Sequence, residues 1–235
     1  MIIVYAMTRN LYPYFMPTIT SLLEHNDPDK VYILAEDDTL PYCLPDVCDV
    51  INVTGMNRFK ESPNNNSIFT YMAMMRVLYP DILPVQKVIQ LDIDTIICDS
   101  LKPLWDIDLT GKWLAACPEH LSTYRICGDT YYNVGVSVHN LEQMRQDNVV
   151  PELVEMLNTK AFNCVEQDAL NIIGQRENKF VPFPVRYNEC FCCGETNNPA
   201  VVHYAGIRFW YSEEFMPRKE YLDKYRGLIM TPPGH

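Results

Sequence analysis

Two carboxylates one residue apart, Asp92 and Asp94, follow the apolar run of KVIQLDIDTII. Val88 to Leu91 has the composition of a buried parallel strand, and ligands commonly bind in the loops at the carbonyl ends of such strands. Alternate side chains of an extended strand share a face, so both carboxylates could coordinate one ion. Hard oxygen ligands suit Mg²⁺, Mn²⁺ or Ca²⁺. The alternative is a pair of solvated turn aspartates.

Composition limits the function classes. The chain has 235 residues, 48% of them hydrophobic, which is enough for one core and fits one large α/β domain over residues 1–235. Its net charge of -11 argues against a nucleic-acid groove or an anionic membrane surface. If the ligand is a phosphate, a metal must help, because each carboxylate repels a phosphate charge by roughly 1 kcal/mol at about 4 Å in water.

The ends of the chain and its cysteines bear on location. Met1 runs directly into the apolar residues 2–6 without the features of a signal peptide, and no apolar stretch approaches the roughly 18 residues of a membrane span. We therefore expect a soluble, cytoplasmic protein with reduced cysteines. Three of these are expected to be core thiols: Cys98, Cys117 and Cys164. The cluster of Cys190, Cys192 and Cys193 leaves zinc binding open, with Cys43 and Cys48 as the further ligands.

Short apolar runs alternate with helical patterns along the chain. The predicted strands are Ile2 to Ala6, Val31 to Leu34, Val50 to Val53, Val88 to Leu91, Trp113 to Cys117 and Val134 to Val138. The predicted helices are Tyr14 to His25, a segment capped by Ser67 that ends before Pro80, a segment opened by Pro151, and Glu213 to Tyr225. Strands separated by helices predict a three-layer α/β/α fold with a mostly parallel central sheet.

Five sequence blocks follow one another along the chain: IVYAMTRN, SIFTYMAMMR, LDIDTIICDSLKPLWDIDL, YYNVGVSVHNL, and VEQDALN followed by HYAGIRFW. In this order they resemble glycosyltransferase family 8, whose members are retaining enzymes with the GT-A fold. The resemblance extends from Ile2 to about Trp210. It implies a single GT-A domain, a nucleotide-sugar donor that is UDP-glucose or UDP-galactose, and Mn²⁺ or Mg²⁺ between the protein and the diphosphate.

The resemblance also implies roles for individual residues at the nucleotide and the metal. Asp92, Asp94 and His203 would be the metal ligands. Arg76 would reach the diphosphate or the donor sugar, and Arg208 would replace a phosphate-binding lysine. The remaining residues of the expected donor-binding set are Ala6, Thr8, Asn10, Tyr12 stacking on the base, Ile93 and Gly206.

The resemblance implies a further group of residues near the hexose. Asn133 would bond the sugar, while Gly135 beside it would let backbone approach closely. Glu166 stands where the family usually has aspartate, so glucose versus galactose stays open. Gln167 matches the residue beneath the anomeric carbon and Asp168 the acidic residue beside it. A structural carboxylate at a helix N-terminus explains Asp168 as an alternative.

The expected reaction is transfer of a hexose with retention, by same-face attack, because none of these residues is an obvious nucleophile. A nucleotidyltransferase is a second interpretation, but the Gly- and Lys/Arg-rich phosphate loop that it needs is missing near residues 7–11. A catalytically inactive module that binds a UDP-sugar or a glycan is the third. The acceptor can be a glycan, a protein side chain or a lipid-linked sugar. Whether the chain forms a homodimer is also open.

Overall fold

The computed structural model describes residues 1–37, 39–40, 43–56, 58–67, 69–120, 130–206 and 216–230. In these residues a seven-stranded sheet has the order β3-β2-β1-β4-β7-β6-β8, and a two-stranded sheet pairs β5 with β9. The strands are β1 (Ile2–Met7), β2 (Lys30–Ala35), β3 (Cys48–Asn52), β4 (Lys87–Leu91), β5 (Thr95–Ile97), β6 (Leu114–Pro118), β7 (Tyr132–Asn140), β8 (Phe180–Pro182) and β9 (Val201–His203).

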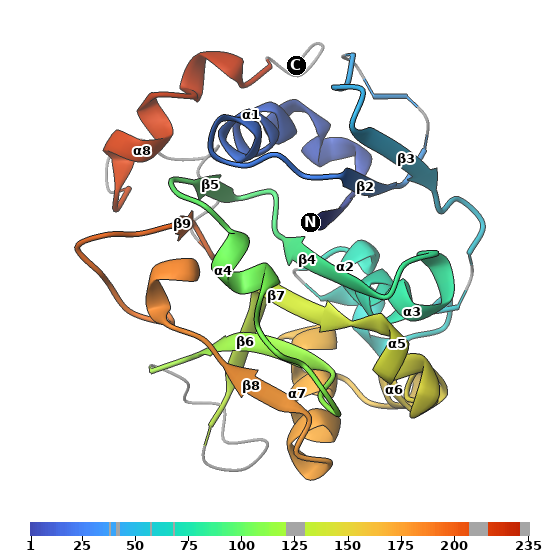
Figure 1. The fold of residues 1–235 in the computed structure, drawn as a ribbon. Coiled ribbons are helices and arrows are strands. Elements are labelled where there is room, and N and C mark those ends of the chain that lie inside the picture. Colours follow the sequence, from blue (N-terminus) through green and yellow to red (C-terminus); the bar gives the residue numbers. More distant parts are fainter. Residues whose placement is uncertain are drawn as a thin grey trace.

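Helices cover both faces of the large sheet (Figure 1). The α-helices are α1 (Phe15–His25), α2 (Tyr71–Met75), α3 (Tyr79–Ile82), α4 (Lys102–Trp105), α5 (Leu141–Gln146), α6 (Val150–Thr159), α7 (Val165–Arg176) and α8 (Lys219–Asp223). Short 3-10 helices are η1 (Arg9–Tyr14), η2 (Pro63–Asn66), η3 (Arg76–Leu78), η4 (Val185–Tyr187) and η5 (Arg226–Leu228). Helices α1 and α4 contribute to one core cluster, whereas α2, α3, α5, α6 and α7 contribute to another.

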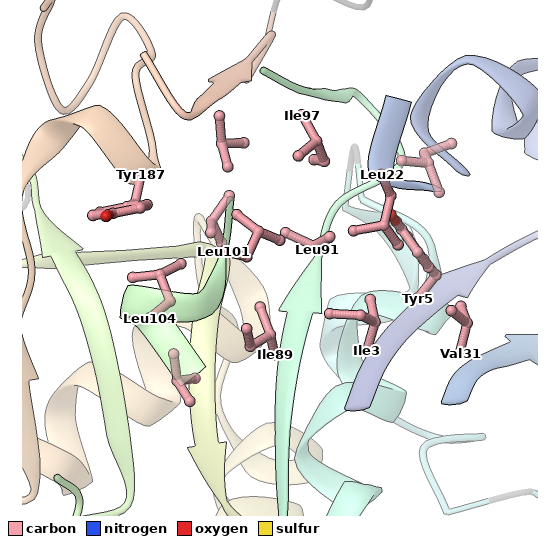
Figure 2. Packing of buried hydrophobic residues seen from close by; sticks show 14 of the residues in the cluster. Ile3, Tyr5, Leu22, Val31, Ile89, Leu91, Ile97, Leu101, Leu104 and Tyr187 are labelled. Atoms are coloured by element: carbon pink, nitrogen blue, oxygen red, sulfur yellow. The ribbon is translucent and has the colours of Figure 1, made fainter. Parts of the chain in front are cut away.

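The alternation of side chains along the strands separates these two cores. Ile3 and Tyr5 of β1 belong to the cluster with α1, and Val4 between them belongs to the opposite cluster. Figure 2 shows Ile3 and Tyr5 in the first cluster near Leu22 of α1, with Leu91 of β4 also in it. Because the central strands are buried on both faces, they are almost continuously apolar, and the sheet edge that follows them is where polar side chains can gather.

Strand β7 sets the arrangement around the candidate site. It runs antiparallel to both neighbours, β4 and β6, while β1 is parallel to β2 and β4. In the small sheet, Thr95 of β5 lies opposite His203 of β9. The small sheet therefore brings a segment from late in the chain next to the turn that follows β4.

The predicted strands and the mostly parallel three-layer fold are confirmed, with differences of up to two residues at the strand ends. The second predicted helix was wrong in its details. It begins after Thr70 instead of Ser67, and Pro80 lies in the first turn of α3 instead of beyond the helix end. Proline is tolerated there because a first-turn N–H has no partner within the helix.

The predicted C-terminal helix is shorter than expected among the described residues. There, the segment from Glu213 to Tyr225 contains only the five-residue helix α8, and residues 213–215 lie outside the described part. Arg218, which precedes α8, has a φ of 56°, in the left-handed region, so it does not continue a helical path.

Candidate active site

Asp92, Asp94 and His203 bring three ligand atoms together at the carboxyl end of β4. His203 Nε2 lies 3.4 Å from Asp94 Oδ1 and 3.7 Å from Asp92 Oδ2. All three atoms lie within 4.8 Å of one another, and among the described residues no other group of three His, Cys, Asp or Glu side chains meets this distance. The His203 side chain is 3% exposed, while the two carboxylates stay partly accessible. The three residues form a candidate metal site.

The two aspartates reach this point from a turn instead of from one extended strand. Strand β4 ends at Leu91, but the Asp92 N–H still donates to Gly135 O of β7 at 2.8 Å. The chain then turns, and Asp94 O accepts the N–H of Tyr204 at 2.8 Å, next to His203. The strand geometry assumed for Asp92 and Asp94 was therefore wrong, although both carboxylates do point toward one position.

Gly135 leaves the space that the metal site occupies. A Cβ atom at this position would lie 2.2 Å from His203 Cε1 and 2.8 Å from Asp92 Oδ2. Real Cβ contacts are not this short, so a side chain here would displace the imidazole or the carboxylate. The close approach expected at Gly135 is made by the protein's own metal-site side chains.

Arg76, from η3, joins the candidate metal site to Glu166 of α7. Its guanidinium lies 2.6 Å from Asp92 Oδ1 and 3.1 Å from Glu166 Oε1, and its side chain is mostly buried. Gln90 Nε2 also donates to Asp92 Oδ1, at 2.9 Å. Since Arg76 and Gln90 both use Oδ1, the Oδ2 atom of Asp92 is the one that faces His203.

Burial raises the pKa of the acidic groups around Arg76. Burial raises the pKa of Glu166 from 4.5 to about 7, although the Arg76 guanidinium opposes this change. The pKa of Asp92 is raised in the same way and opposed by the same guanidinium. For His203 burial lowers the pKa, but the interactions with Asp94 and Cys190 together outweigh it, and the pKa lies well above the ordinary value.

We predict that Glu166 makes the metal-free protein less stable as the pH rises. Because its pKa is about 7 when folded and 4.5 ordinarily, the folded state binds the proton more tightly between these values. This stabilisation is complete below pH 4.5 and is lost as the pH rises through about 7. At about 1.4 kcal/mol per pH unit, the total loss in the free energy of unfolding is about 3 kcal/mol. Urea unfolding at about pH 5 and about pH 8 should show Glu166→Gln gaining most of that amount on the wild type, because pH 5 lies only slightly above 4.5.

The exposed glutamate Glu61 provides the matched control for this pH series. Glu61→Gln removes one carboxyl group from the surface, so its unfolding curves should follow those of the wild type at both pH values. A Glu166→Gln variant whose stability also follows the wild type at both values would contradict the role given to this carboxyl group.

On the expected hexose side, Asn133 and Gln167 converge on Glu119. Asn133 Nδ2 donates to Glu119 Oε1 at 2.9 Å, and Gln167 Nε2 donates to the same oxygen at 3.2 Å. Gln167 Oε1 in turn accepts the Val134 N–H at 3.0 Å. We did not predict Glu119. Its place just after the predicted strand Trp113 to Cys117, at the same edge as Asp92, was the signal that could have identified it.

Asp168 is held by the protein itself. Its Oδ2 atom accepts the backbone N–H groups of Asn163 and Cys164, each at 3.0 Å, and its Oδ1 atom accepts the hydroxyl of Tyr131. These contacts match the alternative interpretation, a carboxylate that stabilises the N-terminal turn of α7. Tyr131, which also accepts a bond from Gln167 Nε2 at 3.1 Å, was not anticipated from sequence.

The expected uridine residues lie at the end of β1 and directly after it, with Ala6 inside the strand. The register of β1 with β4 places Val4 opposite Gln90, which brings Ala6 and Thr8 to the same sheet edge as Asp92. Thr8 donates to Asn10. Tyr12 is 1% exposed and its hydroxyl donates to Asp37 O at 3.1 Å, so its ring lies in the core and presents no open face for stacking. The stacking role expected for Tyr12 is therefore wrong in this structure.

The remaining expected donor residues lie on either side of the metal ligands. Ile93 is buried between the two aspartates. Gly206 has a φ of 74°, in the left-handed region that favours glycine, and a Cβ atom added there would have no atom within 4 Å. Arg208 lies outside the described residues. The roles of all these residues toward a donor stay predictions.

The cysteine cluster does not form the zinc site left open above. Cys43 lies before β3 and Cys48 is its first residue, and β3 is separated from Cys117 in β6 by four strands of the sheet. The Cys190 thiol interacts with Cys192 and Cys193, and Cys193 with Cys117. The eight cysteines of the described part are free thiols, with Cys117 fully buried as predicted and Cys98 and Cys164 partly buried.

Comparison with known proteins identifies the family. The family model described as Glycosyl transferase family 8 matches residues 2–214. The chain belongs to this family. A Haemophilus influenzae protein described as a glycosyltransferase is 27% identical over 208 residues, which cover 76% of this chain and 61% of that protein. Glycosyltransferase GlyF of Streptococcus pneumoniae is 25% identical over 90% of this chain and 57% of its own length. The family 8 chain thus spans less than two thirds of these relatives.

The fold of this family 8 member matches that of solved glycosyltransferases. A complex of the galactosyltransferase LgtC with donor and acceptor sugar analogues aligns with a TM-score of 0.81 at 22% identity, covering 99% of this chain and 98% of that one. The GT-A fold expected from the sequence is therefore confirmed. No helix among the described residues is long and apolar enough to cross a membrane.

Proposed function

We propose that this protein transfers a hexose, glucose or galactose, from a UDP-sugar to an acceptor hydroxyl, with retention of configuration and dependence on a divalent metal. The observation that carries this proposal is the convergence of Asp92 Oδ2, Asp94 Oδ1 and His203 Nε2 at the sheet edge. Membership of family 8 supports sugar transfer, and the donor and acceptor analogues bound to LgtC support a nucleotide-sugar donor and a sugar acceptor.

The three ligand atoms of Asp92, Asp94 and His203 fit a divalent cation such as Mn²⁺ or Mg²⁺. Two carboxylate oxygens and one imidazole nitrogen combine the hard and borderline ligands that Mn²⁺ accepts. His203 Nδ1 is hydrogen-bonded to Asn188 Oδ1 at 2.8 Å, which leaves Nε2 directed at the carboxylates. When bound at Asp92, Asp94 and His203, the metal would act as a Lewis acid for the departing diphosphate.

The side chains near the hexose support same-face attack instead of a covalent intermediate. Glu166 is buried and ion-paired with Arg76, and both oxygens of Asp168 accept hydrogen bonds from the protein. Gln167 has a neutral amide, which is a poor nucleophile. In this proposal Gln167 and Glu119 orient the hexose, and the acceptor proton passes to the leaving phosphate oxygen.

The transferase proposal predicts metal-dependent release of UDP. Purified protein with Mn²⁺ and no acceptor should hydrolyse one member of a panel of UDP-sugars slowly, and a chelator should stop the release. Asp94→Asn replaces a charged carboxylate ligand with a neutral amide and should also stop the release, while Asp46→Asn, at an exposed aspartate, should retain activity. A trapped sugar adduct on Glu166, Gln167 or Asp168 would contradict same-face attack.

The same assay separates the other functions. An inactive binding module would bind UDP with Mn²⁺ and leave every UDP-sugar intact even when glycan, peptide and lipid-linked acceptors are supplied. A nucleotidyltransferase would release pyrophosphate from UTP and a sugar phosphate. Absence of UDP binding in the presence of Mn²⁺ would overturn the proposed function as a whole.

A further inference from the structure

Asn188 is a fully buried polar residue that the site description has used only as a neighbour of His203. It follows η4, and its backbone N–H donates to Val185 O at 2.9 Å. Its side chain is 0% exposed and lies between two residues of the candidate site, His203 and Asn133. A buried amide needs partners for both of its ends, and here both partners belong to the site.

A backbone group fixes the orientation of the two amides. The Gly135 N–H donates to Asn133 Oδ1 at 3.0 Å, which identifies that atom as the oxygen because a backbone N–H requires an acceptor. Asn188 meets the same oxygen at 2.9 Å and must present its Nδ2 there. Its Oδ1 therefore faces His203 Nδ1, at 2.8 Å, and that nitrogen must carry a hydrogen. In the neutral imidazole, which is the form that binds a metal ion, the lone pair of His203 is consequently on Nε2, the atom directed at Asp92 and Asp94.

The hydrogen bonds continue from Asn133 to the expected hexose side. Asn133 uses its Nδ2 for Glu119 Oε1, the oxygen that also accepts from Gln167. A continuous path of side-chain hydrogen bonds thus runs from His203 through Asn188, Asn133 and Glu119 to Gln167. Each amide along the path has its donor and acceptor ends assigned, so changing one member disturbs its neighbours.

We propose that Asn188 is a positioning residue that holds the metal ligand His203 and the hexose-side group of Asn133, Glu119 and Gln167 in one hydrogen-bonded unit. This inference rests on the proposed function, because it assigns one end of the Asn188 amide to metal binding and the other end to sugar transfer. Asn188 Oδ1 sets the tautomer of His203, as partners of metal-binding histidines generally do. Asn188 Nδ2 fixes Asn133, so the ion and the hexose are placed relative to each other by a single amide.

Two variants separate the two ends of this amide. Asn188→Leu removes both hydrogen bonds. Asn188→Asp keeps an acceptor for the His203 Nδ1 hydrogen but places a carboxylate oxygen against Asn133 Oδ1, where a donor is required. Asn64→Leu is the matched control, because Asn64 is a buried asparagine that bonds Leu157 O at 2.7 Å outside the site.

Mn²⁺ affinity, measured by electron paramagnetic resonance of the free ion, tests the His203 end without activity. Asn188→Leu should weaken the Kd about 10- to 100-fold. Asn188→Asp should bind Mn²⁺ at least as tightly as the wild type, and Asn64→Leu should leave the Kd unchanged. A folded Asn188→Leu protein, checked by circular dichroism, with wild-type Mn²⁺ affinity would overturn the inference.

Steady-state kinetics with saturating Mn²⁺ test the hexose end. For Asn188→Asp we expect kcat to fall about tenfold or more while the Mn²⁺ Kd is kept, because Asn133 and its neighbours lose their position. Unchanged kcat and KM in this variant would overturn the coupling. If the wild type itself binds no Mn²⁺, the proposed function fails. If the wild type and Asn188→Leu bind Mn²⁺ equally well, only the role of Asn188 fails, so the two results can be told apart.

Discussion

Arg76→Met is expected to destabilise the metal-free protein by about 3–5 kcal/mol near pH 8. Methionine replaces the apolar stem of the side chain but removes the positive charge between Asp92 and Glu166, which lie 2.6 Å and 3.1 Å from the guanidinium. Glu166 would then be buried without a counter-ion, and Asp92 would keep only His203, whose Nε2 lies 3.7 Å away. Burial already raises the pKa of both carboxyl groups. Urea unfolding with chelator present measures the effect.

The control for Arg76→Met is Arg176→Met. Arg176 forms a two-point ion pair with Glu152, at 2.8 Å and 2.9 Å, but both side chains are about half exposed. Water screens such a pair, so its loss should cost no more than about 1 kcal/mol. Equal losses for the two variants would contradict the importance given to the buried charges.

A second substitution should partly restore the Arg76→Met protein. Adding Glu166→Gln removes one of the two carboxylates that lose the guanidinium, so the double variant should regain stability relative to Arg76→Met. The recovery should be larger near pH 8 than near pH 5, because Glu166 is mostly protonated at the lower pH. Additive losses at both pH values would show that Glu166 is not the group that Arg76 neutralises.

The fold was predictable where the sequence pattern is local. The runs around Val4, Ile33, Ile89 and Val136 are apolar on both faces of a strand, and each forms a strand of the large sheet. The direction of β7 was not predictable in this way, because an antiparallel and a parallel strand have the same composition when both faces are buried. The three-residue strands β5, β8 and β9 are too short to show a period.

The residues of the candidate site also differ in whether a local sequence pattern identifies them. Asp92, Asp94, His203 and Arg76 were predicted from sequence blocks, and the structure brings them together. Asn188 was not predicted, because its place depends on which loop packs beside β7 and nothing in its own neighbourhood marks it. Glu119 was missed although it directly follows a predicted strand. Tyr12 was misjudged because an aromatic residue near a strand end can pack into the core or face a ligand, and only its burial distinguishes the two.

Gly135→Ala should impair the candidate metal site with the smallest change that the chain allows. The added methyl would lie 2.2 Å from His203 Cε1 and 2.8 Å from Asp92 Oδ2, so at least one ligand must move. His203 has little freedom to do so, since its ring is 3% exposed and Nδ1 is bonded to Asn188. We expect the Mn²⁺ Kd to rise by about 100-fold or more and the free energy of unfolding to fall by about 1–3 kcal/mol.

Gly227→Ala separates this steric effect from the general cost of replacing glycine. Gly227 is exposed, has no atom within 4 Å of a Cβ position and does not adopt a positive φ, so alanine there should change neither quantity appreciably. Titration with Mn²⁺ and urea unfolding measure both variants. If Gly135→Ala binds Mn²⁺ like the wild type, β7 and β9 can separate enough to accept a methyl group. The close packing of β7 against His203 would then not be what holds the three ligands together.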